Sequence, residues 1–185
     1  MATSPATSAA VTTWKIDPVH SSAEFKVKHM MVSNIKGSIQ GMTGDLTEHA
    51  TDASLSSIDA TLDASTVNTG LADRDAHLKA ADFLDTEKYP KITFKSTKVE
   101  KKGSEEYAVT GNLTIHGVTK PVTLTVEGPS APQKDPYGNT RIGLSATTKI
   151  NRRDYGLSYN GLLEAGGLVV GDEVHITLDV EFIKA

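Results

Sequence analysis

The segment EVHITLDVEFI at residues 173–183 decides the fold class. Val174, Ile176, Leu178, Val180 and Phe182 alternate along it with polar residues. This period of two is typical of a β-strand that has one dry face. Less regular runs of the same kind cover residues 21–29, 34–46, 55–64, 91–99, 107–115, 121–126 and 141–150. The pattern predicts an antiparallel all-β protein, either a sandwich or a closed barrel.

One segment, GLADRDAHLKAADFLD at residues 70–85, has the spacing of a helix instead. Leu71, Leu78 and Ala81 are predicted to share one helix face, and Arg74 lies between them. An arginine on an inward face needs an anion, which is either a ligand head group or a protein carboxylate. The acids considered for a structural salt bridge are Asp17, Asp154 and Glu164.

The inward positions of the predicted strands are mostly aliphatic, with few aromatic residues and several glycines and alanines. Small side chains fill a barrel poorly, and eight closed strands can enclose one small ligand. The pattern therefore favours an internal cavity, although periodicity does not separate a hollow barrel from a solid core. In a hollow barrel, the residues that line the tunnel for an apolar chain are Phe25, Val27, Ile39, Leu62, Leu78, Phe94, Val109, Leu113, Leu124, Leu144, Ile176 and Leu178.

Composition excludes several classes of protein. A formal net charge of -4 and a pI near 5.8 argue against a nucleic-acid binder, which needs a basic face. The chain has no cysteine, so it has no disulfide, no thiolate nucleophile and no cysteine-based zinc site. Its histidines lack the spacing of metal ligands, and no hydrolase or nucleotide motif is present. We therefore expect no metal and no cofactor.

The first thirteen residues, MATSPATSAAVTT, are rich in alanine, serine and threonine. We predict a disordered tail over residues 1–13 and a single domain over residues 14–185. The tail lacks the basic and apolar regions of a signal peptide, so we expect a cytoplasmic location, or a periplasmic one if the chain is a processed form. No apolar stretch approaches the roughly 20 residues of a membrane-spanning helix, and no amphipathic anchor or basic patch is evident.

A long connection between the last two strands, NRRDYGLSYNGLLEAGGLVVGD, begins with a polar cluster. Long ordered loops often act as lids or binding loops. In one interpretation an arginine of this cluster holds a ligand head group and Tyr155 lines the entrance; in the other, Asp154 pairs with an arginine and pins the loop. His77 either flanks the same mouth or pairs with Asp73 or a backbone carbonyl. The candidates for head-group contacts are Arg74, His77, Arg152 and Tyr155.

Five segments in this order together resemble the YceI-like family of polyisoprenoid-binding proteins. They are WKIDPVHSSAEFKVKH (14–29), TGLADRDAHLKAADFLDTEKYPKITFKST (69–97), VTGNLTIHGVTKPVTL (109–124), INRRDYGL (150–157) and VGDEVHITLDVEF (170–182). The resemblance spans Trp14 to about Ile183. It implies a lipocalin-like, extended eight-stranded antiparallel barrel with one short helix near its mouth.

The resemblance also implies a function. It predicts a protein that binds, and carries or sequesters, a long-chain amphiphilic lipid such as a polyisoprenoid with a quinone or pyrophosphate head. It further implies homodimer formation and no catalysis. The alternatives are a fatty-acid or amide-binding stress-response protein, an interaction module with a filled core, and an enzyme that acts on a prenyl pyrophosphate through Asp73, Arg74 and His77. Membrane contact is expected to be transient, without stable insertion.

Overall fold

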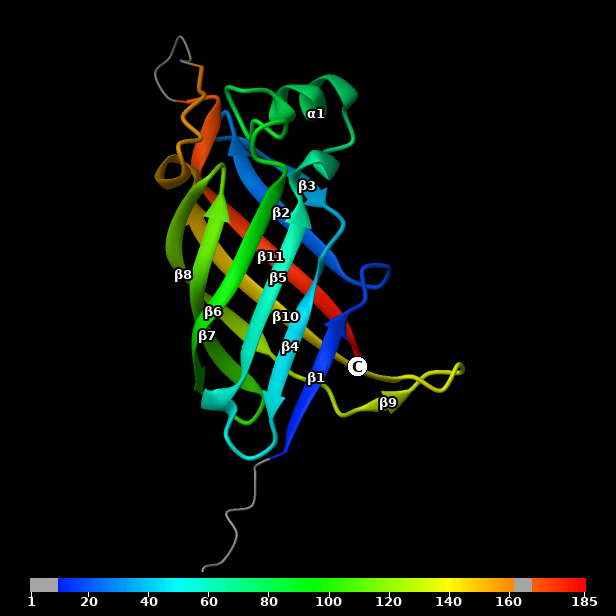
Figure 1. The fold of residues 1–185 in the computed structure, drawn as a ribbon. Helices are drawn as coiled ribbons and strands as arrows, with labels where there is room; N and C mark the ends of the chain where they lie inside the picture. Colours follow the sequence, from blue (N-terminus) through cyan, green and yellow to red (C-terminus); the bar gives the residue numbers. More distant parts are fainter. Residues whose placement is uncertain (1–9, 162–167) are drawn as a thin grey trace, which may run out of the picture.

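The computed structural model describes residues 10–161 and 168–185, and its strands form one antiparallel sheet (Figure 1). The strands are β1 (Val11–Ile16), β2 (Ser22–His29), β3 (Ser33–Ile39), β4 (Thr43–His49), β5 (Ser57–Asp63), β6 (Lys91–Lys101), β7 (Glu106–Ile115), β8 (Val118–Glu127), β9 (Gln133–Lys134), β10 (Thr140–Asn151) and β11 (Val170–Lys184). The helices are α1 (Ala72–Lys79) and the short 3-10 turns η1 (Ala53–Leu55), η2 (Ala64–Thr66) and η3 (Arg152–Tyr155).

The sheet closes because β10 pairs with β11 along almost its whole length, from Arg141 opposite Ile183 to Asn151 opposite Glu173. Eight strands, in the order β11-β1-β4-β5-β6-β7-β8-β10, therefore form a barrel. The predicted eight-stranded antiparallel barrel with one short helix is confirmed.

The barrel is extended at one end because β11 has two successive partners. Near its C-terminus it pairs with β1, whereas residues 170–179 pair with β2. The β2–β3 hairpin thus continues the wall beyond β1. On its far side the chain between β5 and β6 completes the wall: Ser38 of β3 exchanges two backbone hydrogen bonds with Asn68, at 2.8 and 2.9 Å. Helix α1 lies in this segment, at the end of the barrel (Figure 1).

The turn between β7 and β8 consists of His116 and Gly117. Their φ angles are 52° and 71°. Two positive φ angles in a two-residue loop define the type I′ turn, whose twist matches that of the flanking strands. Glycine at the second position adopts this conformation without steric cost.

Three boundaries differ from the predictions. Strand β1 begins at Val11, so residues 11–13 are not part of a disordered tail, and residues 1–9 lie outside the described residues. The predicted run 34–46 is two strands, because Gly41 with a φ of 70° turns the chain between β3 and β4. Helix α1 covers only eight residues of the predicted 70–85, and Leu71 is 52% exposed, so the predicted inward stripe is wrong at that position.

A solid cluster fills the barrel beside β1. Trp14, Ile16, Ile142 and Phe182 are buried there, and Phe182 is fully inaccessible. The indole nitrogen of Trp14 donates to Glu48 at 2.8 Å, which satisfies its buried N–H. None of the helices in the described part of the chain has the length and apolarity that a membrane crossing requires.

Candidate functional site

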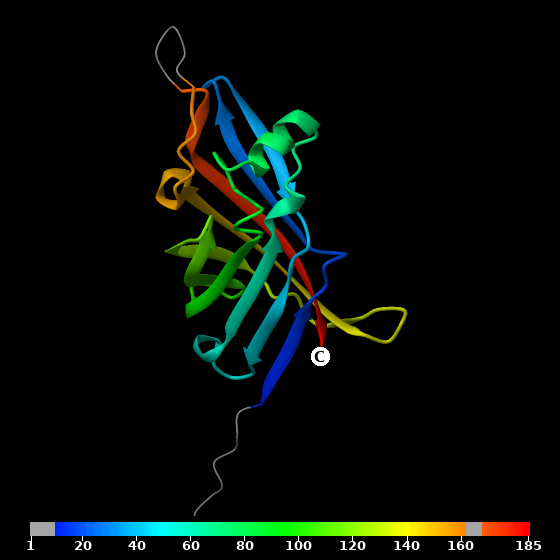
Figure 2. The same ribbon diagram turned by 45° about the horizontal axis from the view of Figure 1, so that its top comes forward.

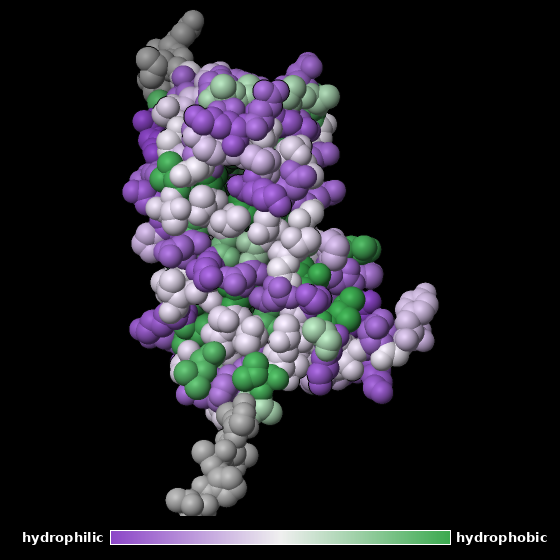
Figure 3. All heavy atoms as spheres, in the orientation of Figure 1, coloured by the Kyte–Doolittle hydropathy of each residue, from purple (hydrophilic) through white to green (hydrophobic). Residues whose placement is uncertain are grey.

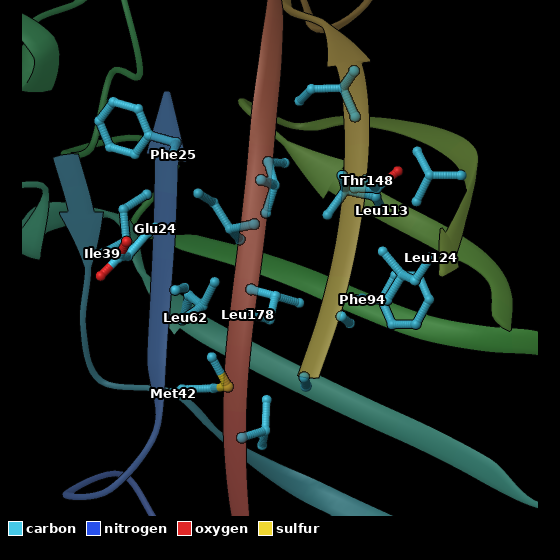
Figure 4. Close-up of a pocket in the computed structure, with 18 of the residues that line it drawn as sticks. Glu24, Phe25, Ile39, Met42, Leu62, Phe94, Leu113, Leu124, Thr148 and Leu178 are labelled. Carbon is cyan, nitrogen blue, oxygen red and sulfur yellow. The ribbon is translucent and has the colours of Figure 1, made fainter. Parts of the chain in front are cut away.

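The barrel encloses a cavity of about 710 Å³, which lies within the range of small-molecule sites. It extends from the α1 end, between the β2–β3 hairpin and α1, to the turns that join β4 to β5 and β6 to β7. The lining is largely apolar, and all twelve residues proposed from the sequence as a tunnel lining border it (Figure 4). A cavity of this size contradicts an interior filled by the protein's own side chains.

Small residues on neighbouring strands create this space. Leu178 of β11 lies in register between Ala23 of β2 and Ala146 of β10, so its side chain projects past two short neighbours. Gly37 and Gly111 have the same effect, because a Cβ added at either position would lie 2.4 Å from the ring of Phe25 or Phe94. Both rings lie over a glycine and border the cavity. The glycines of the predicted strands therefore shape the cavity wall.

Arg74 lies at the α1 end of the cavity. Its Nε donates to the hydroxyl of Thr69 at 2.7 Å and its Nη2 to the Thr69 carbonyl at 3.0 Å. The same hydroxyl donates to Asp75 at 2.5 Å, which orders the start of the helix. A guanidinium has five N–H donors, so three are left without a partner among the described residues. Arg74 is thus held in place by Thr69 and can still donate toward the cavity.

The acids considered as partners of Arg74 lie elsewhere. Asp17 pairs with Arg141, and Asp154 forms no ion pair within residues 10–161 and 168–185. Glu164 lies outside the described residues. Arg74 therefore has no acidic partner for a structural salt bridge among the described residues. Its contact with a ligand head group stays a proposal.

His77 also borders the cavity, one helical turn from Arg74. Its Nε2 lies 2.7 Å from the Asp82 carboxylate, so the predicted pairing with Asp73 is wrong. The ring makes edge contacts with Phe83 and Tyr159, at centroid distances of 5.0 and 4.7 Å. These contacts join the α1 segment to the chain that follows η3. Sequence reasoning missed Tyr159, which falls in a glycine-rich segment without periodicity.

Arg152 borders the cavity but is 97% buried, and its donors are engaged by the protein. It donates to the backbone carbonyls of Leu157, Val170 and Gly171 and faces Asp172 at 3.4 Å. Burial lowers the pKa of this guanidinium from its ordinary value. These contacts hold the loop after η3 against β11. The prediction that Arg152 contacts a ligand head group therefore does not fit its geometry.

Tyr155 does not border the cavity. Its side chain is almost completely buried among Ile92, Leu113, Ile115 and Leu157, and its hydroxyl has no partner among the described residues. Burial raises the pKa of this phenol to about 12. The prediction that Tyr155 lines the entrance is therefore wrong. The predicted pairing of Asp154 with an arginine is also wrong, since Arg153 pairs with Asp172 at 2.7 Å.

A second polar group of lining residues lies at the opposite end of the cavity. It consists of His49 and Lys101 at the ends of β4 and β6, Asp52 in the turn after β4, and Tyr107 of β7. Sequence analysis named no candidate residue at this end of the cavity. The cavity is thus apolar along its length and polar at both ends.

The strongest charge cluster lies outside the cavity. Arg141 Nη1 donates to Asp17 and to Glu181, each at 2.6 Å, and its Nε donates to Asp135 at 2.7 Å. Hydrogen bonds from His20 and Arg141 hold the pKa of Asp17 well below its usual range, and those from Asn139 and Arg141 do the same for Asp135. The guanidinium occupies the position that a cation would take among these acids. The cluster is a structural network that ties β10 to β11 and to the loop after β1.

Comparison with known proteins gives one consistent family. The YceI-like domain matches residues 14–182. A UPF0312 protein of Staphylococcus aureus is 37% identical over 172 residues, which are 93% of this chain and 98% of that protein. A UPF0312 protein of Vibrio parahaemolyticus is 39% identical over 142 residues, 77% of this chain and 75% of that protein.

Solved structures share the fold. The YceI protein of Campylobacter jejuni is 30% identical, with a TM-score of 0.68 over 85% of this chain and 90% of that one. BcnA of Burkholderia cenocepacia has a TM-score of 0.75 at 22% identity, over 90% and 98% of the two chains. A polyisoprenoid-binding domain of Saccharophagus degradans has a TM-score of 0.68 at 18% identity, over 94% and 99%.

Proposed function

The chain belongs to the YceI-like domain family, and we propose that it binds one long-chain amphiphilic lipid inside the barrel and carries it. The observation that supports this proposal is the cavity of about 710 Å³, whose apolar lining is continuous between two polar ends. An elongated apolar cavity fits a chain better than a compact ring system. A chain that is polar at one end matches both the lining and a polar mouth.

The apolar chain of the lipid supplies most of the binding affinity in this proposal. Each buried methylene contributes about 0.8 kcal/mol before the cost of ordering the ligand. Leu62, Leu113, Leu124 and Leu178 offer this contact from four different strands of the barrel (Figure 4). A long chain is therefore held firmly without any strong polar contact, and the head group sets its direction.

We place the head group at Arg74, because its guanidinium borders the cavity with donors left over. Such donors suit a pyrophosphate, a carboxylate or a quinone carbonyl. His77 stands beside it, oriented by Asp82. The hydrophilic side chains gathered over α1 fit a head group that stays near water at this end (Figure 3).

A polyisoprenoid is the ligand that we favour. The description of the Saccharophagus degradans domain as polyisoprenoid-binding supports this choice, although the 18% identity carries the fold alone. A fatty acid or an amphiphilic amide fits the same cavity chemistry and is the second candidate. Binding is favoured over catalysis, because Asp73, which the enzymatic alternative requires beside Arg74 and His77, is exposed and does not border the cavity.

Native mass spectrometry of the purified protein, followed by organic extraction, tests the proposal. The expected result is one lipid per chain, whose released mass and fragments identify chain and head. If none co-purifies, prenyl pyrophosphates, prenyl alcohols and fatty acids are added in turn. A protein that comes off empty and also refuses all three classes has no lipid-binding function of this kind.

A further inference from the structure

The tip of the β2–β3 hairpin exposes three consecutive apolar side chains. Met30, Met31 and Val32 are 43%, 62% and 82% exposed. The amide of Val32 donates to the carbonyl of His29 at 3.1 Å, which closes the turn. The hairpin rises beside α1 at the same end of the barrel (Figure 2). The described residues therefore leave most of the surface of Met31 and Val32 uncovered.

The backbone conformation of the tip is one that methionine rarely adopts. Met30 and Met31 have φ angles of 50° and 59°, which lie in the left-handed region. Turns of this shape favour asparagine and glycine, and a bulky residue is rarely found there. Two methionines oppose the local preference and direct flexible apolar side chains into solvent. Unfavourable backbone of this kind is typical of functional positions.

A row of basic residues crosses the outer face behind this tip. Lys36 of β3, Lys26 of β2, His175 of β11 and Lys149 of β10 are successive cross-strand partners. Lys26 and Lys36 are directly opposite each other, an arrangement of like charges that weakens strand pairing. Glu173 lies 3.3 Å from Lys149 and 2.8 Å from His175, whereas neither Lys26 nor Lys36 has an acidic partner in the described chain.

The hairpin is therefore a basic element in an acidic protein. Between Phe25 and Ile39 the chain has three lysines and no aspartate or glutamate, although its formal net charge is -4. Glu24 lies at the base of β2, and Glu173 and Asp172 lie on the neighbouring strand β11, where Asp172 pairs with Arg153. Sequence analysis did not single out this group, because the lysines alternate with apolar residues and only the strand register places them next to Lys149 and His175.

The tip is continuous with the mouth of the cavity. Val27, His29 and Ile35 of the same hairpin border the cavity, as does Val169. The amide of Met30 donates to the Val169 carbonyl at 2.8 Å, so the tip is attached to the rim. A surface that holds the tip also faces the opening between the hairpin and α1.

We propose that this hairpin docks the mouth of the barrel onto an anionic lipid bilayer. Met30, Met31 and Val32 enter the interface between headgroups and acyl chains, and Lys26, Lys28 and Lys36 lie against the lipid phosphates. This inference goes beyond the proposed function, since it concerns the surface at which the protein meets its lipid source. The charge of the hairpin selects an anionic bilayer over a neutral one.

Flotation of the full chain with vesicles tests the proposal. Vesicles of phosphatidylcholine are compared with vesicles that also contain an equal part of phosphatidylglycerol. We expect binding to the anionic vesicles, weakened by salt, and little binding to the neutral ones. Lys26→Ser with Lys36→Ser weakens binding about 25-fold, because each basic residue near an anionic surface contributes about a factor of five. Met31→Ser with Val32→Ser weakens it by about tenfold or more.

Matched controls sit away from the mouth. Leu55→Ser removes an apolar side chain that is 62% exposed on η1, and Lys134→Ser with Lys184→Ser removes the same charge from exposed positions on β9 and β11. Control variants that lose as much binding as the hairpin variants overturn the proposal. The proposal is also overturned if the Met31→Ser, Val32→Ser variant binds vesicles normally but has half the solution mass of the original protein. That result would show that the tip contacts a second copy of the chain. Lipid occupancy by native mass spectrometry, measured on the same variants, separates failure of docking from failure of lipid binding.

Discussion

Replacing Leu178 by tryptophan tests the cavity directly. Leu178 is half-buried, faces the cavity from the middle of β11 and has Ala23 and Ala146 as its cross-strand neighbours. A larger ring at this position therefore extends into the open space rather than into a packed neighbour. Leu113 is less suitable, because it is buried within the cluster around Ile92 and Tyr155, where overpacking costs about 1–3 kcal/mol.

The expected loss of affinity follows from the chain that the ring displaces. An indole in the tunnel removes the space of roughly four methylenes, each of which contributes about 0.8 kcal/mol when buried. The sum is about 3 kcal/mol, which corresponds to a roughly 200-fold weaker dissociation constant for a chain long enough to fill the tunnel. Short chains that end before Leu178 keep their affinity. The thermal stability of the empty protein is expected to change little, since the ring displaces no protein atoms.

Titration with a series of prenyl or fatty chains of increasing length measures this effect. In the unaltered protein the affinity rises about fourfold per methylene until the tunnel is full. In Leu178→Trp the rise stops several carbons earlier. The control is Thr177→Trp, which places the same ring on the outer face of the same strand, where Thr177 is exposed. If Leu178→Trp and Thr177→Trp give the same length profile as the original protein, the chain does not lie in the barrel.

Three further predictions concern single side chains. In displacement titrations, Arg74→Met weakens the binding of lipids with an anionic head group about tenfold to a hundredfold and leaves long-chain alcohols nearly unaffected. The reason is that charge-assisted hydrogen bonds contribute about 1.5–3 kcal/mol. Equal losses for both ligand classes would show that Arg74 stabilises the fold and does not contact the head group. Asp17→Asn lowers the melting temperature at pH 7 and makes the melting temperature fall less steeply below about pH 4. The pKa of Asp17 is lower in the folded than in the unfolded protein, so this carboxylate stabilises the fold above the unfolded pKa, and the stabilisation is lost as pH falls through the folded pKa. A variant whose melting temperature depends on pH as in the original protein would contradict this. In urea titrations, Tyr155→Phe leaves the free energy of unfolding unchanged or raises it by about 1–2 kcal/mol, because the buried hydroxyl has no partner among the described residues. A clearly lower free energy of unfolding would show that the hydroxyl makes a hydrogen bond.

The strands were predictable because burial on one face imposes a period of two. β2 and β7 were expected within one residue of their observed bounds, and β11 begins three residues earlier than the predicted run. β1 was not predicted, because Val11–Ile16 contains two threonines and follows a tail of similar composition. Its identity as a strand depends on Trp14 and Ile16 meeting partners on β4 and β11, which are non-local contacts.

The apolar part of the site could be predicted for the same reason, whereas the polar part could not. The alternation that defines a strand also decides which side chains point inward, so the tunnel residues follow from the strands themselves. The directions of Arg74, His77, Arg152 and Tyr155 depend on short helices and loops, whose orientation no period encodes. Arg152 shows the consequence: a charged residue in a long loop suggests a ligand contact, yet backbone carbonyls of that loop and of β11 engage its donors. The sequence thus predicts the apolar lining of the cavity, whereas the loops determine which polar groups border its ends.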